Sequence, residues 1–173
     1  MSQRDSGYER KERDCYETPE WVTEALLPHL RRLPTIWEPA CASGKMVRVL
    51  ERHGKVHATD IDTGMDFLKM DDTNCNAIIT NPPYELAREF IVHAIMRMQD
   101  MTGLVAMLLR TDFDHAKTRE HLFGQCNLFA KKIVLTRRIR WFEDSKGSPS
   151  FNHAWFIWDW ENNGRPPTLA YGP

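Results

Sequence analysis

The chain has 173 residues, a length that suits one domain with its own core. Its formal net charge of −1 excludes a protein that binds nucleic acid through an overall positive charge, and no apolar run approaches the roughly 18 residues that a membrane-spanning helix needs. The charged N-terminus, MSQRDSGYERKERDC, has no signal-peptide pattern, so the sequence predicts a cytoplasmic protein.

The cysteines give no sign of a metal site or a redox pair. No two of them stand in a CxxC pattern, and in a cytoplasmic protein they are expected to be reduced thiols. They are Cys15, Cys41, Cys75 and Cys126. We therefore expect no metal.

The N-terminal half predicts helices and strands in alternation. Residues 1–14 are expected to form a flexible charged segment, and Thr18 followed by Pro19 predicts the start of a helix that Pro28 shortens or kinks. A buried strand at 35–40 precedes a helix at 44–54, which ends on Gly54 as its C-cap. Strands at 55–61 and 75–81 and a helix at 85–100 follow.

The C-terminal half continues this pattern and then departs from it. A strand is predicted at 103–109, a helix at 114–125, and two strands with no helix between them at 130–136 and 153–160. Such an order predicts an α/β domain over 15–160 with a mostly parallel sheet, helices on both faces and one antiparallel strand. Residues 161–173 read as a Pro/Gly-rich tail.

Sheets of this kind bind ligands beyond the carboxyl ends of their strands. That rule points to 38–44, Asp60, 81–84 and 110–113. In EPACASGKM, small residues before a helix could let backbone cradle a phosphate or a carboxylate. Met46 after Lys45 excludes a G-x-x-x-x-G-K-[ST] loop.

Asp60 lies 22 residues after Glu38 and is placed to accept hydrogen bonds from ribose hydroxyls. The pair indicates a cofactor that contains a nucleoside. Asp62 is a competing candidate, and a capping role after the strand is the structural alternative for Asp60.

Five segments together resemble a known family. YETPEWVTEALLPHL, WEPACASGK, ATDID, DFL and NPPY, in this order over residues 16–110, are similar to the gamma group of DNA adenine-N6 methyltransferases, which use S-adenosylmethionine. The resemblance implies a Rossmann-like class I methyltransferase fold with a seven-stranded sheet. It also implies that the methionine end of the cofactor is lined by Thr18, Pro19, Glu38, Ala40, Ser43 and Gly44, and the adenosine end by Asp60, Ile61, Asp66 and Phe67.

NPPY, residues 81–84, closes a buried strand with two prolines, which could serve merely to stop the strand. The resemblance gives a chemical interpretation. Asn81 and the Pro82 carbonyl would accept the hydrogens of the target amino group, Pro83 would help to fix the corner, and Tyr84 would stack on a base flipped out of the duplex.

The segment RIRWFEDSKGSPSFNHAWFIW resembles the place where family members put a second aromatic side chain against the base. Trp141, Phe142 and Phe151 are the candidates and Phe142 is favoured, while Asn152 and His153 read as a polar loop. Basic residues precede them and predict either a solvated face or phosphate contacts. These are Arg137, Arg138 and Arg140.

The chain departs from the gamma group in having no room for a large target-recognition domain. We therefore expect relaxed specificity, a very short recognition site, a specificity partner or a homodimer, as in compact phage or prophage enzymes. The predicted activity is methylation of adenine N6 in DNA. Cytosine N4, RNA, a protein glutamine amide and a non-catalytic cofactor-binding subunit remain the alternatives.

Overall fold

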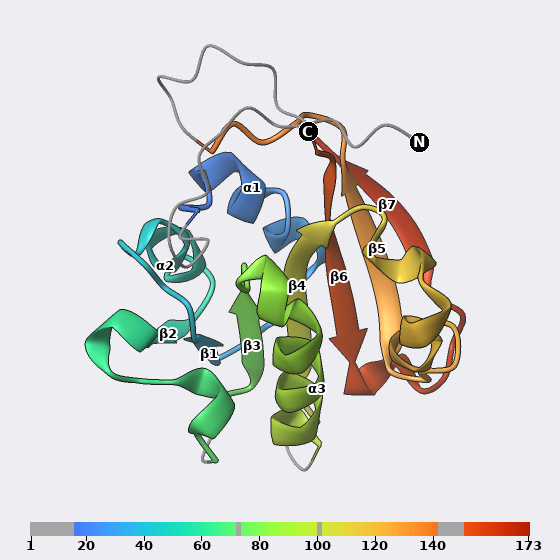
Figure 1. Ribbon diagram of the computed structural model, residues 1–173, viewed down its shortest axis with the longest axis horizontal. Coiled ribbons are helices and arrows are strands. Elements are labelled where there is room, and N and C mark those ends of the chain that lie inside the picture. Colours follow the sequence, from blue (N-terminus) through green and yellow to red (C-terminus); the bar gives the residue numbers. More distant parts are fainter. Residues whose placement is uncertain (1–15, 72–73, 100–101, 142–150) are drawn as a thin grey trace.

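The structure is a computed structural model that describes residues 16–71, 74–99, 102–141 and 151–173. A seven-stranded sheet runs through these residues in the order β2-β1-β3-β4-β6-β5-β7 (Figure 1). β6 is antiparallel to β4 and β5, and the other neighbours pair in parallel. The strands are β1 (Thr35–Glu38), β2 (Lys55–Ala58), β3 (Ala77–Thr80), β4 (Leu104–Arg110), β5 (Phe129–Leu135), β6 (His153–Asp159) and β7 (Thr168–Gly172).

The helices are short except for α3. The α-helices are α1 (Glu20–Glu24), α2 (Lys45–Leu50) and α3 (Ala87–Met98). The 3₁₀ turns are η2 (Leu27–His29), η3 (Ile61–Thr63), η4 (Phe67–Lys69), η5 (Tyr84–Leu86), η6 (Phe113–His115), η7 (Lys117–Leu122) and η8 (Trp160–Asn162).

The core has two layers because strand side chains alternate between the faces of the sheet. Ile78 packs in the layer that includes α3, which crosses in front of the sheet in Figure 1, and Ile79 packs in the layer that includes α1 and α2. Trp155 and Trp158 of β6 are fully buried on these two faces. Their indole N–H groups donate to the carbonyls of Val22 and Leu122, at 2.8 and 2.7 Å.

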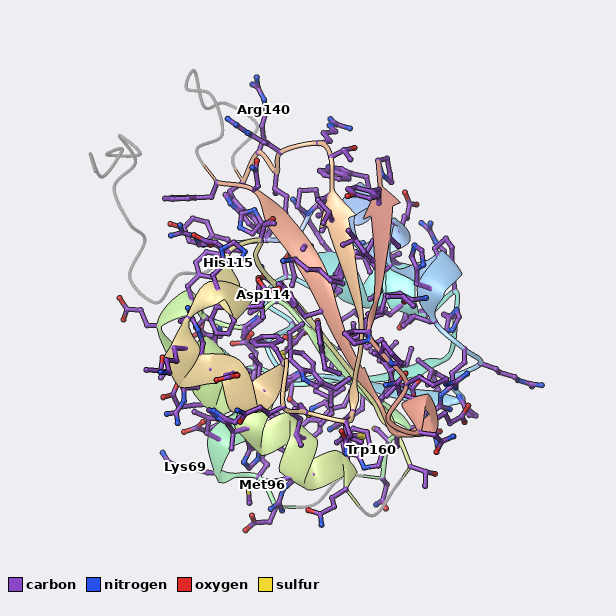
Figure 2. All side chains as sticks on the ribbon, turned by 90° about the vertical axis from the view of Figure 1, so that its right-hand side faces the viewer. Lys69, Met96, Asp114, His115, Arg140 and Trp160 are labelled. Carbon is purple, nitrogen blue, oxygen red and sulfur yellow. The ribbon has the colours of Figure 1, made fainter. Side chains whose placement is uncertain are left out.

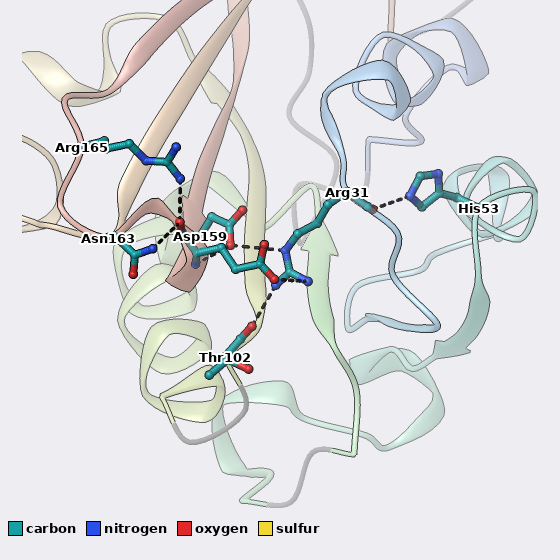
Figure 3. Close-up of polar contacts among 7 residues, drawn as sticks. Arg31, His53, Thr102, Asp159, Asn163 and Arg165 are labelled. Carbon is teal, nitrogen blue, oxygen red and sulfur yellow. Dashed lines mark hydrogen bonds and ion pairs between the residues drawn. The ribbon is translucent and has the colours of Figure 1, made fainter.

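Charged side chains connect the segments at the amino ends of the parallel strands, which we call the amino edge of the sheet (Figure 3). The Arg31 guanidinium donates to the Thr102 carbonyl at 2.8 Å and forms ion pairs with Asp159 at 3.4 Å and Glu161 at 3.3 Å. The Arg31 carbonyl is bonded to the His53 ring at 2.9 Å. This network joins the chain before β1 to the end of β6.

The segment expected as a tail adds the edge strand β7, which pairs in parallel with β5. The strand starts directly after Pro166 and Pro167, which lack the N–H groups that a ladder needs. Asn162 supports the preceding turn by donating to the carbonyls of Asn127 and Arg165. The prolines therefore mark the start of a strand.

Three helix predictions were wrong in detail. Residues 113–122 form two 3₁₀ turns instead of one α-helix. Hydrogen bonds to the strands hold this segment, because the Asp114 carboxylate accepts from Lys132 and the Leu122 carbonyl accepts from the Trp158 indole. α1 starts after Pro19, with no side-chain cap from Thr18. α2 ends at Leu50, and Gly54 permits a close approach instead, since a Cβ there would lie 2.1 Å from the Leu33 carbonyl oxygen.

Candidate active site

The carboxyl ends of the parallel strands form one edge of the sheet, and most of the predicted site residues lie there. β1 ends at Glu38, and Asn81 follows β3 directly. β6 runs the opposite way, so its first residue, His153, pairs with Arg110 at this same edge. Polar groups far apart in the sequence are thus gathered where such sheets bind ligands.

Two adjoining cavities open at this edge, with empty volumes of about 270 Å³ (the inner cavity) and about 690 Å³ (the outer cavity). Both are lined by Tyr16, Ala40, Ala42 and Asn81, so they are two parts of one cleft with Asn81 at their junction. The inner cavity is also lined by Glu17, Thr18, Glu38, Cys41, Ser43, Lys45 and Met46. The outer cavity is also lined by Pro39, Asp60, Ile61, Asp62, Met65, Asp66, Phe67, Pro83, Leu86 and Phe90.

Glu38 places a buried carboxyl group in the wall of the inner cavity. Its Oε1 accepts from the Thr80 hydroxyl at 2.5 Å and from the Ala40 amide at 3.0 Å. Its Oε2 is buried and has no hydrogen-bond partner among the described residues. Burial raises the pKa of Glu38 to about 8, against the lowering effect of the two hydrogen bonds. The carboxyl group is therefore mostly protonated at neutral pH, and Oε2 can meet a polar atom of a ligand.

The loop 40–44 is unsuited to cradling a phosphate. Four of its five amides already donate to acceptors within the protein. Two residues hold it in left-handed backbone conformations, Ala42 at φ 45° and Gly44 at φ 82°. The loop thus offers close approach by small side chains, without the cluster of spare N–H donors that an anion requires.

Asp60 and Asp66 cap short turns while their carboxylates line the outer cavity. Asp60 accepts from the amides of Ala42 at 2.8 Å and Asp62 at 2.9 Å, so the capping interpretation is confirmed. The ion pair with Lys69, at 2.9 Å, holds the pKa of Asp66 below its usual value. Because each carboxylate oxygen can accept more than one hydrogen bond, capping leaves capacity for ligand hydroxyl or amino groups.

Apolar side chains form the rest of the outer cavity. Ile61, Met65 and Leu86 are 56%, 40% and 41% exposed, which is unusual for large apolar residues that gather in one place. Phe67 forms a buried part of the wall and packs edge-on against Trp37, with ring centroids 5.0 Å apart. An apolar slot with a few carboxylates at its rim suits a flat aromatic ligand that carries polar substituents.

Asn81 presents a fixed acceptor at the junction of the two cavities. Its Nδ2 donates to the Tyr16 carbonyl at 3.3 Å, and because a carbonyl can only accept, this contact orients the amide. Its Oδ1 is buried, with no hydrogen-bond partner in the part of the chain that the structure describes. A buried unpaired acceptor costs about 1–3 kcal/mol, a cost that a hydrogen-bond donor entering the cleft could offset.

Tyr84 lies outside the cleft, in a cluster of rings next to it. Its hydroxyl is 2.9 Å from Nε2 of His153. The Tyr16 and Trp141 rings lie 6.1 and 6.4 Å from the Tyr84 ring, between centroids. Pro83 lines the outer cavity and so links the ring cluster to the cleft.

The predicted site residues do not all line the cleft within the described residues. Pro19 and Gly44 do not line either cavity, and Phe142 lies outside the described residues. Sequence reasoning missed Tyr16, which lines both cavities, and the role of His153, which was read as a polar loop residue at the start of the predicted strand although it is 2% exposed and contacts Tyr84. The signal for Tyr16 was its place two residues before Thr18 in the quoted motif; His153 carried no local signal.

The predicted basic residues extend beyond β5 as exposed side chains. Arg137 lies over the Trp21 ring at 5.0 Å, and Arg138 donates to Asn152 at 3.0 Å. Figure 2 shows Arg140 at the opposite end of the molecule from Trp160 and Met96. These cations are therefore at the end of the sheet where the parallel strands have their carboxyl ends.

Comparison with solved structures identifies the architecture. A dimethyladenosine transferase from Plasmodium falciparum aligns with a TM-score of 0.57 and 13% identity, over 83% of this chain and 62% of that one. A structure provisionally assigned to class I of the S-adenosylmethionine-dependent methyltransferases, from Listeria monocytogenes, gives 0.56 and 15%, over 88% and 62%. The chain has the class I methyltransferase fold. It spans less than two thirds of either neighbour.

The type IIG restriction endonuclease BpuSI also aligns, with a TM-score of 0.51 and 16% identity, over 81% of this chain and 24% of that one. No protein-family model and no curated protein matches the sequence. The methyltransferase fold confirms the Rossmann-like architecture predicted from the strand order and the quoted motifs.

Within the described ranges, no group of three or more His, Cys, Asp or Glu side chains is arranged to hold a metal ion. No helix there is long and apolar enough to cross a bilayer.

Proposed function

We propose that the protein transfers a methyl group from S-adenosylmethionine to the exocyclic N6 amino group of adenine in DNA. The observation that carries the proposal is Asn81. Its buried Oδ1 lacks a partner, its amide orientation is set by the Tyr16 carbonyl, and it stands where the two cavities meet. An amino group placed there would supply the missing donor.

The polar and apolar groups of the cleft support binding of S-adenosylmethionine. Its inner cavity offers Oε2 of Glu38, which lacks a partner among the described residues, together with Thr18, Ala40 and Ser43 for the methionine part. Its outer cavity offers Asp60 for the ribose hydroxyls, and for the adenine Ile61, Asp66 and Phe67. When bound, S-adenosylmethionine supplies an electrophilic methyl group on its sulfonium.

The corner 81–84 would activate the target amine. The lone pair of an exocyclic amine is delocalised into the ring, which makes the nitrogen a poor nucleophile. Oδ1 of Asn81 and the Pro82 carbonyl would accept its two hydrogens and stabilise the positive charge that develops on nitrogen during transfer. Because both acceptors are held by a rigid corner, much of the orientational cost is removed before the reaction. The methylated amine then loses its proton readily, so no general base is required.

A DNA substrate fits the surroundings of the corner. Tyr84 would stack on a base that has left the duplex, an interaction worth about 1–3 kcal/mol. The exposed Arg137, Arg138 and Arg140 would contact phosphates, which position the nucleic acid without reading its sequence. The names of two structural neighbours, a dimethyladenosine transferase and a restriction endonuclease, support a nucleic-acid substrate. A specificity partner or a second copy would supply sequence readout, and the expected location is the cytoplasm.

The test is a transfer assay with methyl-labelled S-adenosylmethionine and, separately, plasmid DNA, tRNA and protein extract. We expect N6-methyladenine in the digested DNA. Asn81→Ala should lower the rate about 100-fold or more, because it removes a fixed acceptor of the transition state.

The matched control is Asn74→Ala, an exposed asparagine three residues before the strand that Asn81 follows, which should leave the rate unchanged. Label in cytosine, RNA or glutamine would overturn the adenine assignment and keep the chemistry of the corner. Cofactor binding without transfer to any substrate would favour a non-catalytic subunit.

A further inference from the structure

Tyr84 and His153 are 69 positions apart in the sequence, yet they meet at the carboxyl edge of the sheet. Tyr84 opens the turn η5 after the corner, and His153 is the first residue of β6. The hydroxyl oxygen of Tyr84 lies 2.9 Å from Nε2 of His153. Neither side chain lines the cofactor cleft, so the pair belongs to the neighbouring ring cluster.

The two rings are also stacked beside each other. Their centroids are 5.9 Å apart and their planes differ by 28°. The 2.9 Å contact anchors the hydroxyl end of Tyr84. The nearly parallel imidazole restrains the plane of the tyrosine ring.

His153 is itself held rigidly. Its backbone pairs with Arg110 in the β4–β6 ladder, and its side chain is 2% exposed. The Trp141 ring packs nearly perpendicular to it, at 86° and 5.2 Å between centroids. Burial lowers the pKa of His153 to about 4, and the charge of Arg110 adds to this effect. The imidazole is therefore neutral at physiological pH, a fixed hydrogen-bonding partner rather than a charge.

We propose that His153 is a positioning residue that sets the plane of the Tyr84 ring to receive the target base. The proposal rests on the proposed function of the corner 81–84. A tyrosine ring fixed before the base arrives loses less conformational freedom when the base stacks on it. His153 would thus act on catalysis through Tyr84, without touching the cofactor.

Four variants test the pair. Tyr84→Phe keeps the ring and removes the hydroxyl, and His153→Leu removes the partner at similar size. Each should lower kcat for methyl transfer about threefold to tenfold, the effect of losing one hydrogen bond. The double variant Tyr84→Phe/His153→Leu should lose no more than either single variant, because both remove the same interaction. His153→Gln, whose amide can reach the position of Nε2, should restore most of what His153→Leu loses.

Two readouts separate positioning from general damage. The Kd for S-adenosylmethionine should stay constant in all four variants, and the ¹⁵N resonance of Nε2 in labelled His153 should shift when Tyr84 becomes Phe. Tyr171→Phe is the control, an exposed tyrosine on β7 that should change neither value.

An active wild-type protein whose Tyr84→Phe and His153→Leu variants keep full kcat would overturn the positioning role. So would additive losses in the double variant, or a resonance that does not move. A wild-type protein that methylates no nucleic acid overturns the proposed function itself, and the positioning proposal with it.

Discussion

The amino and carboxyl edges of the sheet differ in how their polar groups are paired. At the amino edge, Arg31 lies between Asp159 and Glu161 and donates to the Thr102 carbonyl, so charge meets opposite charge within the protein (Figure 3). At the carboxyl edge, Oε2 of Glu38 and Oδ1 of Asn81 are buried without partners among the described residues.

This difference separates the part of the molecule that holds the fold together from the part in which we propose the binding site. An unpaired buried polar atom costs about 1–3 kcal/mol, a cost that a ligand can offset when it supplies the missing partner. At the amino edge the charge of Arg31 is balanced within the protein, although its Nε makes an ion pair and no hydrogen bond within the described ranges, whereas at the carboxyl edge a ligand in the cleft would supply the missing partners. Substitutions at the two edges should therefore affect different properties.

The largest effect should come from Asn81→Ala, which should remove activity without removing stability. The methyl-transfer rate should fall about 100-fold or more. The melting temperature should be unchanged or slightly higher, because the loss of the 3.3 Å bond to the Tyr16 carbonyl is offset by removal of an unpaired buried acceptor. Differential scanning calorimetry measures this, and a fall of several degrees would break the comparison.

Arg31→Ala should do the reverse. The side chain is 27% exposed and loses one hydrogen bond and two ion pairs, a destabilisation of about 2 kcal/mol, or ~5 °C in melting temperature. Activity at 25 °C should be retained. Arg32→Ala, at the exposed neighbouring position, is the matched control for thermal melting. Equal melting temperatures for the two variants would contradict the role of the network.

Glu38 should make stability depend on pH in an unusual direction. Its pKa of about 8 in the folded protein exceeds the ordinary value of 4.5, so between these values the folded state holds a proton that the unfolded state lacks. Stability should therefore fall as pH rises from about 5 to 8, with a slope approaching ~1.4 kcal/mol per pH unit, or about 3 °C per unit.

Glu38→Gln, which cannot ionise, should flatten that slope in melts between pH 5 and 8. Glu51→Gln, an exposed glutamate at the end of α2, should not. If the wild type and Glu38→Gln show parallel pH profiles, the carboxyl group is not buried as a neutral acid.

The smallest effect should appear at the surface of the binding edge. Arg140→Ala should reduce the slope of log affinity against log salt for DNA by ~0.7–0.9, the contribution of one phosphate contact. Arg165→Ala, an exposed arginine near the amino edge, should leave the slope unchanged. Binding titrations at several salt concentrations distinguish the two. An unchanged slope for Arg140→Ala would place the nucleic acid elsewhere.

Most of the sheet was predictable because its central strands are buried apolar runs bounded by turn-forming residues. Residues 77–80 and 104–110 are almost wholly buried, and apolar runs of that kind read as central strands. β7 was not predictable, because the two prolines before its five residues indicate a turn. Its partner strand β5 is also more than 30 positions away in the sequence. The turns at 113–122 were missed for the same reason, since bonds to β5 and β6 override the helical pattern.

In the candidate site, too, positions set by chain order could be predicted and contacts made by folding could not. Glu38, Asp60 and Asn81 could be predicted because each lies at the end of a strand or within two residues after it, where chain order alone fixes the position. The partners of these residues could not be predicted. His153 meets Tyr84 only because β6 runs antiparallel beside β4, and Tyr16 reaches Asn81 only through the folded path of the chain before α1.

The two buried tryptophans of β6 have a mechanical consequence. Trp155 donates to a carbonyl in α1, and Trp158 donates to a carbonyl in η7, on opposite faces of the sheet. If either covering layer slid along the sheet, a buried indole N–H group would lose its acceptor, which is costly in a close-packed interior. The two indole N–H groups therefore hold both covering layers in register against β6.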